Sequence, residues 1–273
     1  MIQSSAIPRF FLRWGAILTA CFLSASLLLS ADAAGCGWYC TRGKNHAQPV
    51  ADPRLSEVER YGGLYIDHTH TEPDAADKVI YLTFDAGYEN GNVSRVLDAL
   101  KEEGAVAAFF ILGNLTARNP DLLRRMADEG HLICNHTYTH KNLCGAPAGT
   151  LTEELTRLER ACREQAGVEV AKYFRPPEGC YDVAMLKEAS AAGYQTVFWS
   201  FAYADWDNGR QPDPAAAKRK ILENVHNGEV MLLHPTSETN AAILGEVLRE
   251  LKDMGYRFGT LHELGGGAER EGL

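Results

Sequence analysis

The chain has 273 residues, of which 45% are apolar, and a formal net charge of −9. This is enough apolar material for one large domain or two small domains with a well-packed core. The acidic balance argues against a protein that binds nucleic acid or the surface of an anionic membrane.

The amino terminus has the pattern of an export signal. Arg9 and Arg13 precede an apolar run at residues 14–29, and Ala31 and Ala33 fit a signal-peptidase site. We therefore expect residues 1–33 to be a cleaved signal peptide, because the apolar run is short for a membrane span. An uncleaved membrane anchor and lipidation at Cys36 are the alternatives. All three imply an exported protein that is secreted or associated with the cell wall.

Removal of the signal would leave a net charge of about −10. It would also leave six cysteines: Cys36, Cys40, Cys134, Cys144, Cys162 and Cys180. An even number in an exported protein permits disulfides, and the nearest pairs in sequence are Cys36 with Cys40 and Cys134 with Cys144. The sequence does not determine the pairing. A zinc ribbon is not expected, because the chain has no CxxC pair.

Residues 34–77 predict an extended lead-in with one short helix near residues 55–60, because they contain many glycines and prolines and little periodicity. Residues 265–273 predict a disordered tail. Between them, at residues 78–264, strand-like and helix-like patterns alternate. The predicted strands are 79–84, 105–112, 131–135, 173–175, 195–201, 229–233 and 256–259. The predicted helices are 93–103, 120–129, 152–165, 183–192, 214–227 and 240–254.

Each of these helical patterns is followed by a glycine, as helix ends prefer: Gly104, Gly130, Gly167, Gly193, Gly228 and Gly255. Repeated strand–helix units of this kind predict an α/β fold with a parallel sheet, namely a distorted seven-stranded (β/α) barrel of the TIM type. A doubly wound open sheet is the alternative. No glycine fingerprint for a dinucleotide follows the first strand, which disfavours it.

Polar side chains follow several of the predicted strands. Asp85 ends the apolar run at 79–84, and Arg175 precedes two prolines that fix the backbone after a strand. Asp205 and His234 each follow another apolar run. Taken singly, such a group is usually a helix cap, a surface residue or a satisfied core residue. Because a barrel brings the carboxyl ends of all its strands to one rim, we expect them to meet at a single site.

Two histidines add a candidate metal site at the same rim. His136 and His140 stand four residues apart in NHTYTH, just after the predicted strand at 131–135. Two imidazoles at this spacing can bind one metal ion if the segment turns. Taken alone, they are more often solvated loop residues, and the residue after His136 is Thr137 instead of the glutamate of zincins.

Five motifs occur in this order along the chain: TFDxG, HTxxH, RPPxG, DW and LLH. Over residues 78–262 this set resembles the polysaccharide deacetylase family, the carbohydrate esterases of the chitooligosaccharide-deacetylase type. The longer stretches TFDAGYENG, FAYADWD and LLHPTSETNA are similar to peptidoglycan N-acetylmuramic acid deacetylases, which prepare muramic δ-lactam in spore cortex.

The resemblance implies a role for each polar residue. Asp85 would be the general base and His234 the general acid that protonates the leaving amine. Arg175 would orient Asp85, and Asp205 would hold His234 in its working tautomer. His136 and His140 would bind a divalent metal, most simply zinc. The chemistry needs these types, because amide hydrolysis requires a polarised carbonyl, a proton acceptor and a proton donor.

Other residues near the motifs are candidates for binding the sugar. Trp206 would wall the pocket, and Tyr88, Glu89, Pro176 and Tyr138 are the further substrate-binding candidates. Tyr181 is another aromatic that could stack on a sugar ring. Except for Trp206, an ordinary packing role is the more common one for such aromatics.

The chain departs from the family at Ala86, where most members have a second aspartate that completes the metal site. The metal would then be held by two histidines with water and substrate, or another oxygen such as that of Glu89 would take part, or no metal would be used. Zinc prefers three protein ligands in catalytic sites. We therefore expect weaker metal binding than in relatives with the full triad.

Together these features predict an exported hydrolase that removes the acetyl group from N-acetylmuramic acid in peptidoglycan, with muramic δ-lactam formation as a further step. The expected partners are glycan strands and no nucleic acid, with membrane contact only through an uncleaved amino terminus, and the chain is expected to be a monomer. The alternatives are a deacetylase of N-acetylglucosamine polymers and, because of Ala86, a catalytically silent glycan-binding protein.

Overall fold

The computed structural model describes residues 36–53 and 56–266, without the side chain of Cys36. The predicted signal segment at residues 1–33 lies outside this range, as does most of the predicted tail. Within the described residues, no helix combines the length and the apolar character that a membrane span requires.

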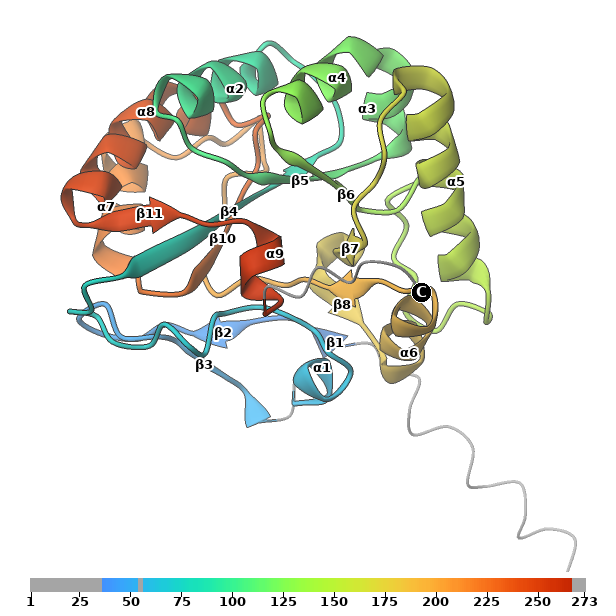
Figure 1. Ribbon diagram of the computed structural model, residues 1–273, viewed down its shortest axis with the longest axis horizontal. Coiled ribbons are helices and arrows are strands. Elements are labelled where there is room, and N and C mark those ends of the chain that lie inside the picture. Colours follow the sequence, from blue (N-terminus) through green and yellow to red (C-terminus); the bar gives the residue numbers. More distant parts are fainter. Residues whose placement is uncertain (1–35, 54–55, 267–273) are drawn as a thin grey trace, which may run out of the picture.

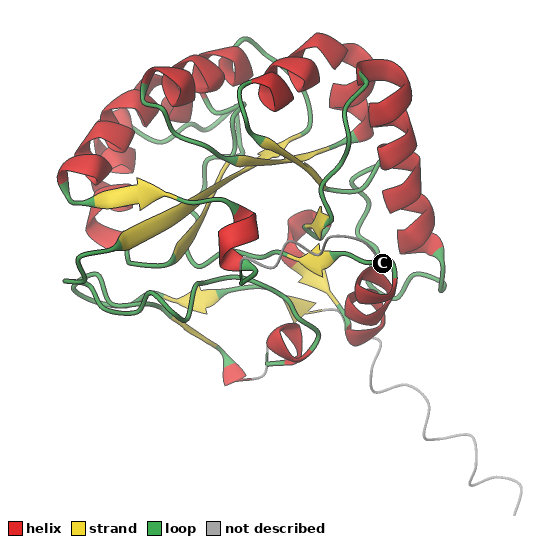
Figure 2. Ribbon diagram, viewed as in Figure 1, coloured by secondary structure: helices red, strands yellow, loops and turns green. Residues whose placement is uncertain are grey.

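A seven-stranded parallel sheet forms the centre of the molecule, and helices surround it (Figures 1 and 2). Its strands are β4 (Lys78–Ala86), β5 (Ala108–Ile111), β6 (Leu132–Asn135), β7 (Tyr173–Phe174), β9 (Gln195–Thr196), β10 (Glu229–Leu233) and β11 (Tyr256–Phe258). They follow the order β10-β4-β5-β6-β7-β9, and β11 also pairs with β4. All seven predicted strands are therefore confirmed, as is the fold class.

The sheet is curled, and the strands at its two ends, β9 and β10, approach each other. Beyond β9, Phe201 forms a parallel bridge with Met231 of β10, and the amide of Leu232 donates to the carbonyl of Phe201 at 2.9 Å. The predicted strand at 195–201 is thus only partly regular: Leu64 bridges Val197 from the lead-in, and the chain then crosses to β10. The result is a distorted barrel whose strands share one carboxyl-end rim.

Strand β4 shows how the barrel divides its side chains between two faces. Ile80, Leu82, Phe84 and Ala86 pack into the apolar cluster shared with the surrounding helices. Val79 and Tyr81 belong to the cluster inside the barrel. Because side chains alternate along a strand, Asp85 points to the same inner side as Tyr81. The alternation therefore directs Asp85 into the barrel and Ala86 away from it.

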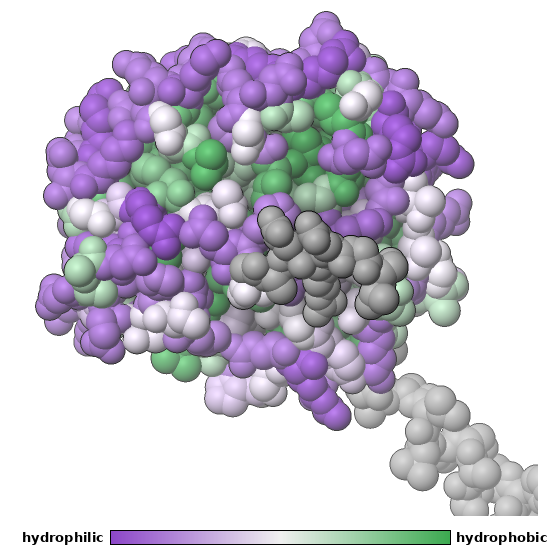
Figure 3. Space-filling view, in the orientation of Figure 1, coloured by the Kyte–Doolittle hydropathy of each residue, from purple (hydrophilic) through white to green (hydrophobic). Residues whose placement is uncertain are grey.

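The helices cover the outer face of the sheet with their apolar sides. They are α2 (Asn92–Glu102), α3 (Gly113–Arg118), α4 (Pro120–Asp128), α5 (Thr150–Ala166), α6 (Val183–Ala191), α7 (Pro214–Asn224) and α8 (Glu238–Asp253). The short α9 (Leu261–Leu264) instead places Leu261 in the cluster inside the barrel. A 3-10 turn occupies Pro177–Gly179. Figure 3, in the orientation of Figure 1, shows hydrophilic residues on the outside of this helix layer and hydrophobic residues on its inner side. The six predicted helices are present; α3 and α9 were not predicted, because both are too short to show a helical period.

The predicted end of α7 is wrong. This helix stops at Asn224, and Gly228 has another role. Its φ is +75°, and a Cβ atom at this position would lie 2.6 Å from the carbonyl oxygen of Asp67. Gly228 therefore permits the lead-in to approach the barrel closely, and its carbonyl accepts from the amide of Asp67 at 2.9 Å. The glycines that follow α2, α4, α5, α6 and α8 all have positive φ, as predicted.

The lead-in packs against the barrel, as Figure 1 shows below β8. It contains β1 (Cys36–Gly37), β2 (Cys40–Thr41), β3 (Val50–Ala51) and the expected short helix, α1 (Glu57–Arg60). β1 pairs antiparallel with β8 (Cys180–Tyr181), and β2 pairs with β3. Trp38 stacks on Phe198 with ring centroids 4.6 Å apart, and its Nε1 donates to the carbonyl of Trp199 at 2.8 Å. These contacts extend the core to the lead-in.

The described disulfide does not join Cys144 to Cys134, its nearest neighbour in sequence. Cys144 forms a disulfide with Cys180, which joins the segment after His140 to β8. Cys134 is a free buried thiol inside the barrel, and burial raises its pKa above the usual value. Strand β6 thus directs Cys134 away from Cys144, although only ten positions separate them.

Candidate active site

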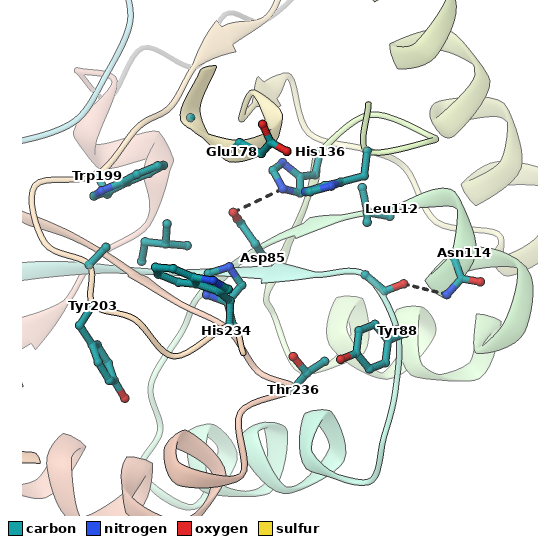
Figure 4. A pocket seen from close by; sticks show the side chains of 16 residues that line it. Asp85, Tyr88, Leu112, Asn114, His136, Glu178, Trp199, Tyr203, His234 and Thr236 are labelled. Carbon is teal, nitrogen blue, oxygen red and sulfur yellow. Dashed lines mark hydrogen bonds and ion pairs between the residues drawn. The ribbon is translucent and has the colours of Figure 1, made fainter. Parts of the chain in front are cut away.

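A cavity of about 670 Å³ opens at the carboxyl ends of the strands. It is lined by residues from six strand-end segments and the loops that follow them: Asp85, Gly87, Tyr88, Leu112, Asn114, His136, His140, Glu178, Gly179, Trp199, Ala202, Tyr203, Trp206, Leu232, His234 and Thr236. Figure 4 shows Asp85 between the rings of His136 and His234. The barrel therefore brings Asp85, His136 and His234, which follow different predicted strands, together at one cavity.

Arg175 fixes the carboxylate of Asp85. Its Nη1 donates to Oδ1 of Asp85 at 2.8 Å, and the guanidinium lies 4.1 Å from the centroid of the Phe110 ring. Three more of its N–H groups donate to the carbonyls of Val197 (3.1 Å) and Phe198 (3.1 Å) and to the Thr83 hydroxyl (2.9 Å). Arg175 is completely buried. Its planar fork thus holds one orientation of Asp85.

This environment keeps Asp85 ionised. Burial alone would raise the pKa of the Asp85 carboxyl, but the facing His136 ring and the Arg175 guanidinium outweigh it and hold the pKa below its usual value. At neutral pH the group is a carboxylate that can accept a proton.

His136 has one nitrogen that is free to bind a ligand. Its Nδ1 lies 2.8 Å from the carbonyl oxygen of Arg175, which can only accept, so Nδ1 carries the proton. Burial lowers the pKa of His136 to about 4, and the ring is therefore neutral at pH 7. Its Nε2 lone pair faces Oδ2 of Asp85 at 3.4 Å. Two electron-pair donors directed at each other are stabilised by a cation between or beside them.

His140 lies beside His136 because the backbone between them turns sharply. The two ring centroids are 4.9 Å apart, although His140 is exposed and His136 is buried. Thr137 has φ +70° and His140 has φ +58°. Positive φ is rare for a β-branched residue and places the second imidazole near the first. The pair fits a divalent cation with two protein ligands.

Among the residues that the structure describes, no third ligand completes a metal triad. Ala86 is buried in the apolar cluster under the helices, so its methyl group faces away from the cavity. Glu89 accepts from the amides of Val93 (3.0 Å) and Ser94 (3.4 Å), so it caps α2 and does not line the cavity. Across the described ranges, no three His, Cys, Asp or Glu side chains gather closely enough to hold a metal ion. A metal site here would therefore have two histidine ligands.

His234 is held by Asp205 on the opposite side of the cavity. Asp205 Oδ1 accepts from Nδ1 of His234 at 2.8 Å, and Oδ2 accepts from its amide at 2.8 Å. Burial alone would lower the pKa of His234, but the hydrogen bond and charge of Asp205 raise it above its ordinary value. The protonated form is therefore more favoured than in an ordinary histidine, and in that form Nε2 is a donor.

Asn240 supports this pair from the first turn of α8, and no pattern in the sequence predicted this role. Its Nδ2 donates to Oδ2 of Asp205 at 2.6 Å and to the carbonyl of His234 at 3.1 Å. The hydroxyl of Tyr203 donates to Oδ1 of Asn240, which fixes the direction of the amide. Asp205 thus accepts from three donors and is almost completely buried.

The predicted sugar-binding residues divide into two groups. Trp206 and Tyr88 line the cavity with exposed fractions of 61% and 43%, and the Trp206 ring lies 6.1 Å from that of His234. Tyr138 lies instead between Gly113 and the guanidinium of Arg157, which is 3.8 Å from its ring centroid.

Two further candidates do not line the cavity. Pro176 is not among the lining residues and directly precedes the 3-10 turn at Pro177–Gly179. Tyr181 is buried edge-on against Phe198, with 5.1 Å between the ring centroids. Glu178, Trp199 and Thr236 line the cavity and were not predicted.

Comparison with known proteins agrees with this geometry. A model of the family "Polysaccharide deacetylase" matches residues 72–197. Peptidoglycan-N-acetylmuramic acid deacetylase PdaA of Bacillus subtilis is 37% identical over 228 residues, which cover 83% of this chain and 84% of that protein. The chain belongs to the polysaccharide deacetylase family. The predicted family and enzyme class are thereby confirmed.

Two other comparisons refine the placement of this polysaccharide deacetylase. The solved structure of Bacillus subtilis PdaA, a family 4 carbohydrate esterase, aligns with a TM-score of 0.79 at 36% identity and covers 85% of this chain and 97% of that one. A peptidoglycan-N-acetylglucosamine deacetylase of Bacillus cereus is 37% identical over 194 residues, or 69% of this chain and 88% of that protein.

Proposed function

We propose that this protein is an exported deacetylase that removes the acetyl group from N-acetylmuramic acid residues of peptidoglycan. The observation that carries the proposal is the pairing of a base and an acid across one cavity. Asp85 is oriented by Arg175, and His234 is oriented by Asp205. The similarity to PdaA over most of both chains supports muramic acid as the substrate.

Each half of the site has one task in amide hydrolysis. Asp85, ionised and fixed by Arg175, accepts a proton from the water that attacks the acetyl carbonyl. His234, whose Nδ1–H is committed to Asp205, donates the proton on Nε2 to the departing amine. This donation is needed because an amide anion is a poor leaving group.

His136 and His140 would hold a divalent cation, with zinc as the simplest choice for imidazole ligands. When bound, the cation polarises the acetyl carbonyl and lowers the pKa of water. Because Ala86 supplies no third ligand, we expect EDTA dialysis to remove zinc readily and added zinc to restore activity. Zinc that stays bound at nanomolar affinity against the chelator would contradict the two-ligand site.

Trp206 and Tyr88 would stack on sugar rings of a glycan strand at the cavity mouth. After deacetylation, the freed amine and the lactyl carboxylate of muramic acid lie on the same sugar, so closure to a δ-lactam is the proposed further step. We expect a monomer exported by the segment at residues 1–33.

Mass analysis of defined glycan strands after incubation with the purified protein tests the substrate. Loss of one acetyl group from muramic acid is expected, and a further loss of water marks the lactam. Unchanged strands would overturn the proposal. Asp85→Asn serves as the control, because it should bind strands without turnover.

N-acetylglucosamine polymers are the second candidate substrate, and one observation favours them. None of the described residues that line the cavity is lysine or arginine, and Glu178 adds a carboxylate to the wall. Such a lining lacks an obvious partner for the lactyl carboxylate of muramic acid. Acetyl loss from glucosamine alone in the same mass analysis would identify this activity.

The third candidate, a catalytically silent glycan-binding protein, is disfavoured because the chain keeps both members of the base pair and both members of the acid pair. A binding module would have no use for Asp85 with Arg175 on one side and His234 with Asp205 on the other. Binding of strands with no acetate release by the wild-type protein would nevertheless establish that role.

A further inference from the structure

The loop between β6 and α5 carries both candidate metal ligands in a strained conformation. Thr137 and His140 have positive φ, and neither is glycine. Such conformations cost free energy and persist only where neighbouring groups hold them. Something must therefore stabilise the turn at residues 137–140.

Glu154, near the start of α5, supplies three of the contacts that hold this turn. Its Oε2 accepts from the amide of Tyr138 at 2.9 Å, from the amide of Thr139 at 2.8 Å and from the Thr139 hydroxyl at 3.0 Å. Tyr138 and Thr139 are the two residues between the strained positions. One carboxylate thus binds the middle of the turn and fixes both of its amides.

Other contacts hold the same turn from within and behind. The amide of His140 donates to the Thr137 hydroxyl at 3.0 Å, and the amide of Thr137 donates to Oδ1 of Asn135 at 3.0 Å. The carbonyl of Tyr138 accepts from the amide of Gly113 at 3.1 Å. These contacts come from the loop itself and from β6 and α3. Glu154 connects the backbone of the turn to the long helix α5, and Arg157 of the same helix contacts only the ring of Tyr138, at 3.8 Å from its centroid.

We propose that Glu154 is a positioning residue for the metal site: it holds the 138–139 turn so that the ring of His140 stays beside that of His136. The inference rests on the proposed function, because it assumes that these two histidines bind the cation. A site with two protein ligands depends strongly on preorganisation, since no third ligand maintains the geometry when one imidazole moves. Loss of such a supporting contact typically weakens metal affinity by about 10- to 100-fold.

Zinc affinity measured by competition with a chromophoric chelator tests this role in the full chain. We expect Glu154→Ala to weaken zinc binding by about 10- to 100-fold. Glu154→Gln keeps an acceptor oxygen and should fall between Glu154→Ala and the wild type. Glu153→Ala is the matched control, because Glu153 is exposed in the same helical turn and its carboxylate has no partner among the described residues.

We expect the wild type and Glu153→Ala to bind zinc equally tightly, Glu154→Gln to bind it more weakly, and Glu154→Ala to bind it most weakly. Thermal unfolding of the zinc-free proteins separates positioning from a general structural role. If Glu154 had only a structural role, Glu154→Gln would have a lower melting temperature but an unchanged zinc affinity. Equal affinity in all four proteins would overturn the inference and leave the proposed metal site intact. Absence of zinc binding by the wild type would overturn the proposed metal site, and this inference with it.

Discussion

Asp205→Asn should impair the acid half of the site while leaving the fold intact. Oδ2 of Asp205 accepts from two donors, the His234 amide at 2.8 Å and Asn240 Nδ2 at 2.6 Å. The oxygen of an asparagine would therefore take this position, and its NH₂ group would replace Oδ1. That group would face Nδ1 of His234, which now donates to Oδ1 at 2.8 Å. Two donors would oppose each other whenever His234 is protonated.

The size of the effect follows from the lost interaction. A hydrogen bond to a charged group contributes about 1.5–3 kcal/mol, which corresponds to about a 10- to 150-fold change in the ratio of protonated to neutral imidazole. The pKa of His234 is raised in the native protein, so the variant should lower it. Because the rate falls as pH rises through the pKa of a general acid, the alkaline limb of the pH profile should move to lower pH.

Acetate release as a function of pH measures this shift, and NMR titration of the His234 ring reports the pKa directly. Asp207→Asn is the matched control, because Asp207 is exposed in the same loop and its carboxylate accepts only from the Gly209 amide, at 2.9 Å, among the described hydrogen bonds. The control should keep the native pH profile. If Asp205→Asn also keeps it, with a full neutral-pH rate, His234 is not a general acid held by Asp205.

Three further predictions concern the base, the buried charges and the disulfide. Asp85→Asn should lower acetate release by about 10²- to 10⁴-fold while glycan binding is retained; a smaller loss in rate assays would exclude a general base here. Burial alone would lower the pKa of His226, but the Glu229 carboxylate 3.0 Å away raises it above the usual value of 6.5. The contribution of the His226–Glu229 ion pair to the free energy of unfolding is therefore complete below about pH 6.5 and is lost as pH rises through the folded-state pKa of His226. Urea unfolding should show this pH dependence in the wild type but not in Glu229→Gln. Replacing Cys144 and Cys180 by serine should cost about 3–4 kcal/mol of unfolding free energy for a loop of 36 residues, and the reduced wild type should match that variant in denaturant titrations.

Local patterns were sufficient to predict the strands and the gathering of polar groups at one rim. Apolar runs followed by glycine-terminated helices specify parallel strands, and parallel strands must share a carboxyl-end rim. The meeting of Asp85, His136 and Arg175 could therefore be predicted, because each lies at the carboxyl end of a strand. The alternation within β4 also settles the directions of Asp85 and Ala86.

Only the tertiary structure decided which side chains reach the cavity from the loops. Tyr88 and Trp206 face it, whereas Tyr138 packs against Gly113 and Glu89 caps α2. The residues that brace the site, Asn240 and Glu154, come from helices, and their contacts depend on how α8 and α5 are rotated over the barrel.

The disulfide between Cys144 and Cys180 likewise depends on two loops meeting in space. Sequence periodicity fixes the direction of a side chain relative to its own strand or helix. The path of a loop and the rotation of a helix are set by packing against distant segments, and that information is not contained in any local stretch of the chain.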